Sequence, residues 1–341
     1  MLAAVASAST GVKMPQMNAG ALVISLDFEL YWGVRDKRTL ADYGRNILGG
    51  REVIPALLDL FAAHKIGATW ATVGFLFCAD KEELLASLPY LRPSYGDPNL
   101  SPYDDLATLG PDERRDPYHF GQSLVRRISA YDGQEIGTHT FSHFYCLEEG
   151  GAPEVFRADL EAAKTVAARL GIAIESLVFP RNQVGCEHLR IAHELGLSAF
   201  RGNQRVWFHR ASKETEQSLG KRAARFADSY LPIAGHHVHE PQVIEGMVDV
   251  VASRFLRPVR GGWLDRVLLE RICAEMTHAA KTRTLFHLWW HPHNFGAAPS
   301  ANVDFLRRVL DCFARLQDRF GIQSLNMGAV ARRVRACQSY S

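Results

Sequence analysis

The sequence lacks the features that mark several large classes of protein. Its six cysteines are dispersed, with no CxxC pair and no framework spacing, which is typical of reduced thiols in a cytoplasmic protein. No stretch approaches the ~20 apolar residues of a membrane span. No GxGxxG or Walker pattern occurs, which argues against a nucleotide cofactor. The formal net charge of +2 gives no reason to expect nucleic acid or an anionic membrane surface as the main partner.

What is present is typical of a globular protein of one large domain. Hydrophobic residues make up 47% of the chain and charged residues 22%. Residues 1–19 have neither the basic start nor the leucine-type apolar run of a signal peptide, so we expect a disordered lead-in and a cytoplasmic location. There is no internal repeat and no obvious linker, and we therefore expect residues 20–335 to form a single domain.

Apolar runs of strand length alternate with helical patterns along the chain. ALVISL at 21–26 is the first predicted strand; after a loop ending in Gly49-Gly50, residues 51–67 have helical spacing, and ATWATVGFLF at 68–77 is the second strand. Further strands are expected just before residues 139, 181, 201 and 291. Six or seven βα units predict an α/β barrel-like domain with insertions at about 80–118 and 203–262. The first insertion is either a lid or substrate wall, or a surface decoration.

The stretch QEIGTHTFSHFYC, residues 134–146, places His139 and His143 four residues apart after a short β-like run. On a helical turn, side chains at i and i+4 lie on the same face. Two imidazoles so placed can share a metal ion if a carboxylate arrives from elsewhere. Alternatively, the two histidines are unrelated and merely begin a helix.

Other chemically active residues also stand where predicted strands end. In a barrel these carboxyl ends converge on one mouth, so residues far apart in sequence would meet. A carboxylate with two histidines makes three protein ligands for a divalent ion, a second carboxylate could accept a proton, and a late histidine could protonate a leaving amine. These parts fit metal-assisted hydrolysis of an amide or ester. The residues at the other strand ends are Asp27, Glu29, Arg181, Asn182, His291 and His293.

The order of these motifs resembles that of the polysaccharide deacetylase family, which is carbohydrate esterase family four of the NodB-homology superfamily. The resemblance covers roughly residues 21–330 and rests on DFE after the first strand, HTFSH after the third, an arginine after the fourth and a histidine at a late strand end. Within the superfamily the chain looks more like the DFExxWG-type cytoplasmic members. The resemblance implies a distorted (β/α)7 barrel and a hydrolase of non-peptide carbon–nitrogen bonds that removes N-acetyl groups from amino sugars.

The resemblance also implies a role for each matching residue. His139 and His143 match the metal histidines, and the ion would be zinc, with cobalt, nickel or manganese as alternatives. Asp27 matches the general base, and Arg181 matches the arginine that orients this base. His291 matches the histidine that acts as general acid, with His293 as the second choice.

Further residues are expected to contact the substrate. A backbone N–H near Phe144 or Tyr145 would help to hold the oxyanion. Asn182 is a candidate substrate contact. Trp289 and Trp290 are candidates for stacking on a sugar ring, with one of the two expected in the barrel core and Trp290 chosen as the substrate contact. The resemblance thus implies that the partner is an acetylated amino sugar in a glycan or glycoconjugate.

The chain departs from the family pattern at one position. The family has two adjacent aspartates, and the second, a metal ligand, is replaced by Phe28. On a regular strand Asp27 and Glu29 point to the same face, so Glu29 could supply the missing carboxylate. Otherwise Asp27 binds the metal itself, or the site works without one. Alternative functions on the same fold are a metal-independent or deformylase-type amide hydrolase and a non-catalytic carbohydrate-binding barrel.

Overall fold

The computed structural model describes residues 17–204, 228 and 235–338 of the 341-residue chain. Most of the predicted lead-in, residues 1–19, and a large part of the predicted second insertion, residues 203–262, therefore lie outside the described residues. In chain order the strands are β1 (Ala21–Phe28), β2 (Ala68–Thr72), β3 (Gln134–Thr138), β4 (Ser176–Leu177), β5 (Ala199–Phe200), β6 (Gln242–Ile244), β7 (Met247–Asp249), β8 (Arg254–Phe255), β9 (Leu285–Trp290) and β10 (Gln323–Leu325).

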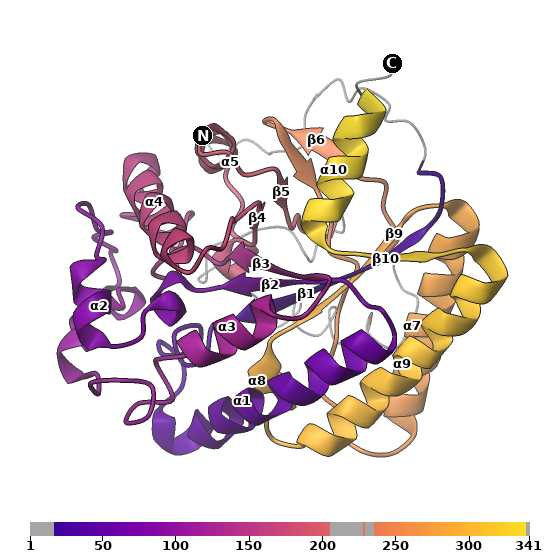
Figure 1. Cartoon of the computed structure of the whole chain (residues 1–341), viewed down its shortest axis with the longest axis horizontal. Coiled ribbons are helices and arrows are strands. Elements are labelled where there is room, and N and C mark those ends of the chain that lie inside the picture. The colour runs from indigo at the N-terminus through magenta and orange to yellow at the C-terminus, as the bar shows by residue number, and fades with distance from the viewer. Residues whose placement is uncertain (1–16, 205–227, 229–234, 339–341) are drawn as a thin grey trace.

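Helices connect most of these strands and cover the sheet. The α-helices are α1 (Leu40–Ala63), α2 (Lys81–Ala86), α3 (Gln122–Ser129), α4 (Pro153–Arg169), α5 (Cys186–Glu194), α7 (Trp263–Thr282), α8 (Pro292–Phe295), α9 (Pro299–Phe320) and α10 (Met327–Gln338). Short 3-10 helices are η1 (Gly74–Phe77), η2 (Pro98–Leu100), η3 (Tyr103–Thr108) and η4 (Pro180–Asn182). Figure 1 shows β1, β2 and β3 side by side in the middle of the molecule, with α1 and α9 below them.

One curled, mixed sheet contains all ten strands, in the order β6-β7-β5-β4-β3-β2-β1-β9-β8, with β10 also paired to β1. Every pair is parallel except β6–β7. Between the described residues, no strand pairing joins β8 back to β6, so the sheet forms a curled, open barrel. The predicted barrel-like α/β fold is confirmed. Because the strands around β1 are parallel, their carboxyl ends lie at one edge of the sheet.

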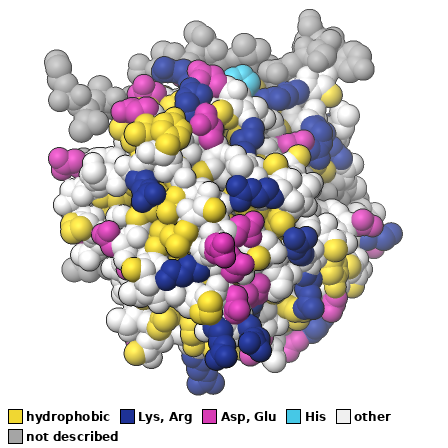
Figure 2. Space-filling view, turned by 60° about the vertical axis from the view of Figure 1, so that its left-hand side comes forward, with side chains coloured by type: hydrophobic (Ala, Val, Ile, Leu, Met, Phe, Trp, Pro, Cys, Tyr) yellow, Lys and Arg dark blue, Asp and Glu magenta, His cyan; other side chains and the backbone are white. Residues whose placement is uncertain are grey.

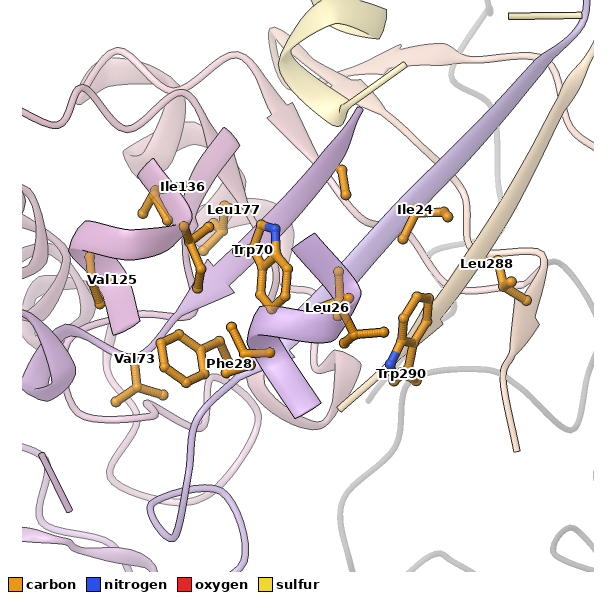
Figure 3. Close-up of a cluster of buried hydrophobic side chains, with 14 of the residues drawn as sticks. Ile24, Leu26, Phe28, Trp70, Val73, Val125, Ile136, Leu177, Leu288 and Trp290 are labelled. Carbon is orange, nitrogen blue, oxygen red and sulfur yellow. The ribbon is translucent and has the colours of Figure 1, made fainter. Parts of the chain in front are cut away.

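Both faces of the strand β1 are covered, and this strand has three hydrogen-bonded neighbours. All eight of its residues are buried, and it is bonded to β2, β9 and β10. On one face Phe28 packs edge-on against Trp70 of β2, with ring centroids 6.5 Å apart. Figure 3 shows both rings with Leu26 and Trp290 in the same apolar cluster. Each such buried side chain contributes roughly 1.5–3 kcal/mol through removal of its apolar surface from water.

The helix α1 corrects one sequence expectation. It begins at Leu40, where Thr39 and Asp42 form a capping box, and runs through Gly49-Gly50, which were expected to end a loop. The two glycines are needed for close packing rather than for a turn. A Cβ on Gly49 would fall 2.2 Å from the carbonyl oxygen of Gly296, and one on Gly50 would fall 2.7 Å from the Cα of His293. Helix α8 and its histidine can therefore lie directly against α1.

The segment at 80–118 contains α2, η2 and η3 rather than a fully irregular loop. Its residue Tyr95 is buried against the 139–146 loop, where the tyrosine hydroxyl accepts a hydrogen bond from the Tyr145 N–H at 2.8 Å. The segment therefore supports the loop that carries the histidine pair.

On the face in Figure 2, basic and acidic side chains are interspersed rather than gathered into a patch of one sign. None of the described helices is both long and apolar enough to cross a membrane.

Candidate active site

The carboxyl end of β1 supplies two buried carboxylates. Asp27 and Glu29 each expose about 3% of their surface, and the residue between them, Phe28, is 1% exposed and points into the apolar cluster of Figure 3. Side chains alternate across a strand, so Asp27 and Glu29 share the face opposite to Phe28. The residue that replaces the family's second aspartate is thus a core residue, and Glu29 is the second carboxylate at the site.

The two histidines after β3 lie in a loop, not on a helical turn as the i, i+4 argument assumed. Thr140 (φ 64°) and His143 (φ 60°) adopt left-handed backbone conformations that turn the loop back on itself. Buried Asp159 of α4 fixes this turn by accepting hydrogen bonds from the N–H of Phe141 at 2.6 Å, the N–H of Ser142 at 3.2 Å and the Ser142 hydroxyl. Burial raises the pKa of Asp159 to about 6, although these bonds lower it. The loop brings the two imidazoles together, with ring centroids 5.0 Å apart.

The same turn uses the backbone groups that were expected to hold an oxyanion. The hydroxyl of Thr140 donates to the carbonyl of His139 and accepts the N–H of Phe144 at 2.7 Å. The N–H of Tyr145 donates to Tyr95 at 2.8 Å. Both donors are therefore already engaged in holding the loop. The prediction that Phe144 or Tyr145 supplies the oxyanion N–H is wrong.

The second pair of histidines follows β9. His291 is the N-cap of α8, where Asn294 Oδ1 accepts the His291 backbone N–H at 3.3 Å and lies 3.1 Å from His291 Nδ1. His293 is the second residue of α8 and is buried, with Nδ1 2.9 Å from the hydroxyl of Tyr43. The side chain of His291 is 22% exposed, whereas that of His293 is 5% exposed. His291 is therefore the histidine of this pair that solvent and a substrate can reach.

Glu29 lies in the middle of these four imidazoles. Its Oε2 is 3.4 Å from Nε2 of His139 and 3.2 Å from Nε2 of His143. Its Oε1 is 3.1 Å from Nε2 of His293 and 3.6 Å from Nε2 of His291. The carboxylate also lies against Gly33, where a Cβ would fall 1.9 Å from Glu29 Cδ. The glycine of the DFExxWG pattern is thus needed for Glu29 to occupy this position.

Burial and the imidazoles act in opposite directions on these groups. Burial would raise the pKa of Glu29, but His291, His139, His143 and His293 together bring it well below its usual value. Burial lowers the pKa of both His143 and His293, and their hydrogen bonds to Glu29 offset this only in part. An ionised carboxylate beside neutral imidazoles is the set of groups that a divalent ion requires.

The hydrogen bonding of His139 tests whether such an ion would fit. His139 Nδ1 lies 2.8 Å from the carbonyl oxygen of Val178. A carbonyl only accepts, so Nδ1 carries the proton of the neutral ring, and the lone pair on Nε2 faces the Glu29 carboxylate. A lone pair and a carboxylate that face each other are suited to a cation between them. Glu29, His139 and His143 offer three ligand atoms within 4.8 Å of one another, so these residues fit a metal ion.

Asp27 is held by an arginine, but not by Arg181. Arg201, which follows β5, donates from Nη1 to Oδ1 at 2.6 Å and from Nη2 to Oδ2 at 2.7 Å. Arg181 instead pairs with Asp36 and lies 4.3 Å from the ring centroid of Tyr145. The prediction that Arg181 holds Asp27 is therefore wrong, because the arginine that holds this carboxylate is Arg201. The physical reason is the left-handed backbone at Arg181 (φ 53°), which turns its side chain toward the Asp36 loop.

The Arg201–Asp27 pair is itself supported from behind. Asn182 Oδ1 accepts from Arg201 Nη2 at 3.1 Å, so the structure places this predicted substrate contact against the arginine that holds Asp27. Ser25 accepts from Arg201 Nη1 at 3.1 Å, and His287 Nε2 lies 2.8 Å from the same hydroxyl. Burial would raise the pKa of Asp27, but Arg201, His139 and His291 outweigh it and lower the pKa. Asp27 is an ionised carboxylate in a fixed orientation.

The expected role of Trp290 is contradicted by its burial. Its side chain is 0% exposed and stacks on Phe295, with ring centroids 5.5 Å apart, in the apolar cluster of Figure 3. Strand alternation places the neighbouring Trp289 on the opposite face. Trp289 is partly exposed, covers the Arg201 guanidinium at 4.1 Å and lies 5.7 Å from the His291 ring. The aromatic residue beside the site is therefore Trp289.

No protein-family model and no curated protein matches this sequence. Among solved structures, a putative polysaccharide deacetylase from Mycobacterium smegmatis is similar at 15% identity, with a TM-score of 0.58 over 97% of this chain and 96% of that chain. The chain has the polysaccharide deacetylase fold. A probable polysaccharide deacetylase from Pseudomonas aeruginosa PAO1 (12% identity, TM-score 0.52, 92% and 89% covered) and Puue allantoinase (12%, 0.53, 94% and 91%) also have this fold.

Within the polysaccharide deacetylase fold, the structure brings together most of the residues named from the sequence. Asp27, Glu29, His139, His143, His291 and His293 meet at the carboxyl edge of the sheet. Sequence reasoning missed Arg201, Asp159 and Tyr43. Arg201 carried a usable signal, because it follows a predicted strand in AFRGN just as Arg181 does in FPRN. Asp159 and Tyr43 lie within helices and carry no such signal.

Proposed function

We propose that this chain is a metal-dependent hydrolase that removes an N-acetyl, or another N-acyl, group from an amino sugar. The observation that carries the proposal is the pair of buried carboxylates at the end of β1. One of them, Glu29, lies among histidine imidazoles, and the other, Asp27, is held by two hydrogen bonds from Arg201. Two carboxylates with such different partners are suited to two different tasks at one site.

The metal would be held by Glu29, His139 and His143. Two nitrogen ligands and one carboxylate oxygen are typical of catalytic zinc, with cobalt, nickel and manganese as other ions for the same donors. When bound, such an ion acts as a Lewis acid toward the carbonyl oxygen of the substrate and makes water more acidic. The chain itself fixes the donors in advance, through Val178 behind His139 and Tyr145 behind His143.

Asp27 is the residue that takes a proton from the attacking water. It is ionised, and the guanidinium of Arg201 fixes both of its oxygens, so the carboxylate cannot rotate away from the site. Arg201 itself is 1% exposed and covered by Trp289, which keeps bulk water away from the pair. A buried, oriented base is expected to contribute about 10²–10⁴-fold to the rate.

His291 is the residue that protonates the leaving amine. Its Nε2 lies 3.6 Å from Asp27 Oδ2 and 3.6 Å from Glu29 Oε1, so it faces the same space as the base and the metal ligands. Its partial exposure gives it access to a substrate, and Asn294, whose Oδ1 lies 3.1 Å from His291 Nδ1, fixes the ring. His293 is too deeply buried for this task.

The substrate class rests on the fold and on the aromatic side chain beside the site. Two similar structures carry the description polysaccharide deacetylase, and a partly exposed tryptophan, Trp289, adjoins His291 as a stacking surface for a sugar ring. We therefore propose an acetylated amino sugar of a glycan or glycoconjugate, acted on in the cytoplasm. A third similar structure is an allantoinase, which favours an amide hydrolase of another substrate class as the second candidate. The sequence leaves open that such a hydrolase works without metal.

The test is a hydrolysis panel with the full-length protein. N-acetylated and N-formylated amino sugars and short oligosaccharides, together with allantoin, are incubated with the protein as purified, after chelation, and after zinc is restored. We expect acetate release that stops on chelation and returns with zinc. Turnover of allantoin that chelation leaves unchanged would instead establish the second candidate, and release of formate alone would correct the acyl group.

A further inference from the structure

The two oxygens of Glu29 face two different pairs of histidines. Oε2 faces His139 and His143, which the proposed function uses, whereas Oε1 faces His291 and His293. Glu29, His291 and His293 form a second group of three donors whose ligand atoms all lie within 4.8 Å of one another. The groups share only Glu29.

Distances argue for two cation positions rather than one. A nitrogen ligand lies 2.0–2.1 Å from zinc in proteins, so two nitrogen ligands of one ion are at most about 4.2 Å apart. Even when ligand atoms are allowed to lie up to 4.8 Å apart, Glu29 and the four described histidines do not form a single group. They form two groups of three, which overlap at Glu29. One ion therefore cannot bind all four imidazoles where they stand. One carboxylate can, however, bridge two ions, as in two-metal hydrolases.

The second group is prepared for a cation in the same way as the first. Asn294 holds the His291 ring in place, because its Oδ1 accepts the backbone N–H of His291 at 3.3 Å and lies 3.1 Å from His291 Nδ1. His291 Nε2 faces Glu29 Oε1 and Asp27 Oδ2, each 3.6 Å away. Tyr43 fixes Nδ1 of His293 at 2.9 Å, as Tyr145 fixes Nδ1 of His143 at 3.1 Å.

We propose that Glu29, His291 and His293 form a second binding position for a divalent cation, bridged through Glu29 to the position at His139 and His143. The consequence for catalysis rests on the proposed function: a cation at the second position occupies Nε2 of His291, the atom that would protonate the amine. Excess metal is therefore inhibitory. The second ion should bind at least about tenfold more weakly than the first, because the two like charges repel each other.

The test counts bound ions and does not depend on turnover. Full-length protein freed of metal by chelation is dialysed against rising zinc and measured by elemental analysis, and Mn²⁺ is added separately for electron paramagnetic resonance. We expect two zinc ions per chain at saturation and a spin-coupled manganese signal. His293→Gln should reduce the count to one and remove the coupling, whereas His64→Gln, a matched change at the far end of α1, should keep both ions.

Saturation at one ion per chain would overturn the proposal, and so would a His293→Gln variant that still binds two. If His293→Gln does not fold, His291→Gln at the exposed edge of the site gives the same reading. In turnover assays, wild-type activity should fall at least about tenfold as the second ion binds, as expected when a general acid is lost. Two bound ions without acyl hydrolysis would support the second cation position and contradict the proposed function. One bound ion with acyl hydrolysis would contradict the second position and support the proposed function.

Discussion

Asp27 is the last residue but one of β1 and Glu29 directly follows the strand, yet the surroundings of the two carboxylates differ in kind. Asp27 is paired with Arg201, a cation that is permanent at any pH the fold survives. Glu29 is surrounded by four imidazoles, whose charge changes with protonation and whose lone pairs can bind a metal ion. The comparison shows how one strand end gives two carboxylates different surroundings. A guanidinium with a permanent charge fixes Asp27, whereas imidazoles that can bind a proton or a metal ion surround Glu29.

Replacement of Glu29 should have the largest effect, because this carboxylate is common to both histidine pairs. In Glu29→Gln the amide carries no charge to attract a cation, and metal affinity should fall by more than the roughly 10–100-fold seen when only an outer-shell partner is lost. Elemental analysis after dialysis and acetate release measure the two consequences. The exposed Glu82→Gln is the matched control. Undiminished metal content in Glu29→Gln would remove Glu29 from the site.

Replacement of Asp27 should distinguish the proposed role of this carboxylate from that of Glu29. Asp27→Asn keeps the shape of the side chain but cannot take a proton, so kcat should fall about 10²–10⁴-fold. Metal content should be unchanged, because the ion is assigned to Glu29. The matched control is the exposed Asp318→Asn, and elemental analysis together with kcat measures both properties. Loss of the metal in Asp27→Asn would mean that Asp27 is a ligand, which is the alternative left open by the sequence.

Substitutions of Arg201 and Arg181 test which arginine holds Asp27 in place. Lysine cannot reproduce the two hydrogen bonds of a guanidinium, so Arg201→Lys should lower kcat by about 10–100-fold, equivalent to the loss of one hydrogen bond to a charged group. Arg181→Lys should have a smaller effect, because its carboxylate partner is Asp36. Steady-state kinetics of the two variants gives the comparison. Equal losses of kcat in both would contradict the assignment of Arg201 to the base.

How far the sequence predicted this site depends on the kind of information each residue needs. Parallel strands around β1 must place their carboxyl ends together, so the meeting of Asp27, Glu29, His139 and His291 follows from the strand order alone. The choice of Glu29 over Phe28 follows from strand alternation, which is also a local rule. Both were predictable without coordinates.

Other features depend on backbone conformations that the sequence does not display. Arg181 and Arg201 both follow strands, and only the left-handed backbone at Arg181 decides which of them reaches Asp27. The same holds for the 139–146 loop, whose turn at Thr140 engages the Phe144 N–H that was expected to face the substrate. Trp290 and Trp289 were separable by alternation once the register of β9 was known.

The smallest expected effect lies behind the base, at His287. Burial is the main cause that lowers the pKa of this histidine to about 3, with Arg201 adding to it. As pH falls from 7, the unfolded chain gains a proton at about 6.5 that the folded chain does not, so the free energy of unfolding should fall by up to about 1.4 kcal/mol per pH unit until the folded pKa is reached. His287→Gln removes this contribution.

Urea unfolding of metal-free protein at pH 7, 6 and 5 measures it. Between pH 7 and pH 5, the free energy of unfolding of the wild type should fall by up to about 2 kcal/mol more than that of His287→Gln. The reason is that about one and a half pH units of this range lie below the unfolded pKa of about 6.5. His64→Gln, at the end of α1, should follow the wild type. Hydrogen bonds link Asp27, Arg201, Ser25 and His287, and none of these four side chains is assigned to the metal. The difference in pH dependence between the wild type and His287→Gln should therefore be the same with and without zinc. If zinc changed this difference, the titration of His287 would be coupled to metal binding at Glu29.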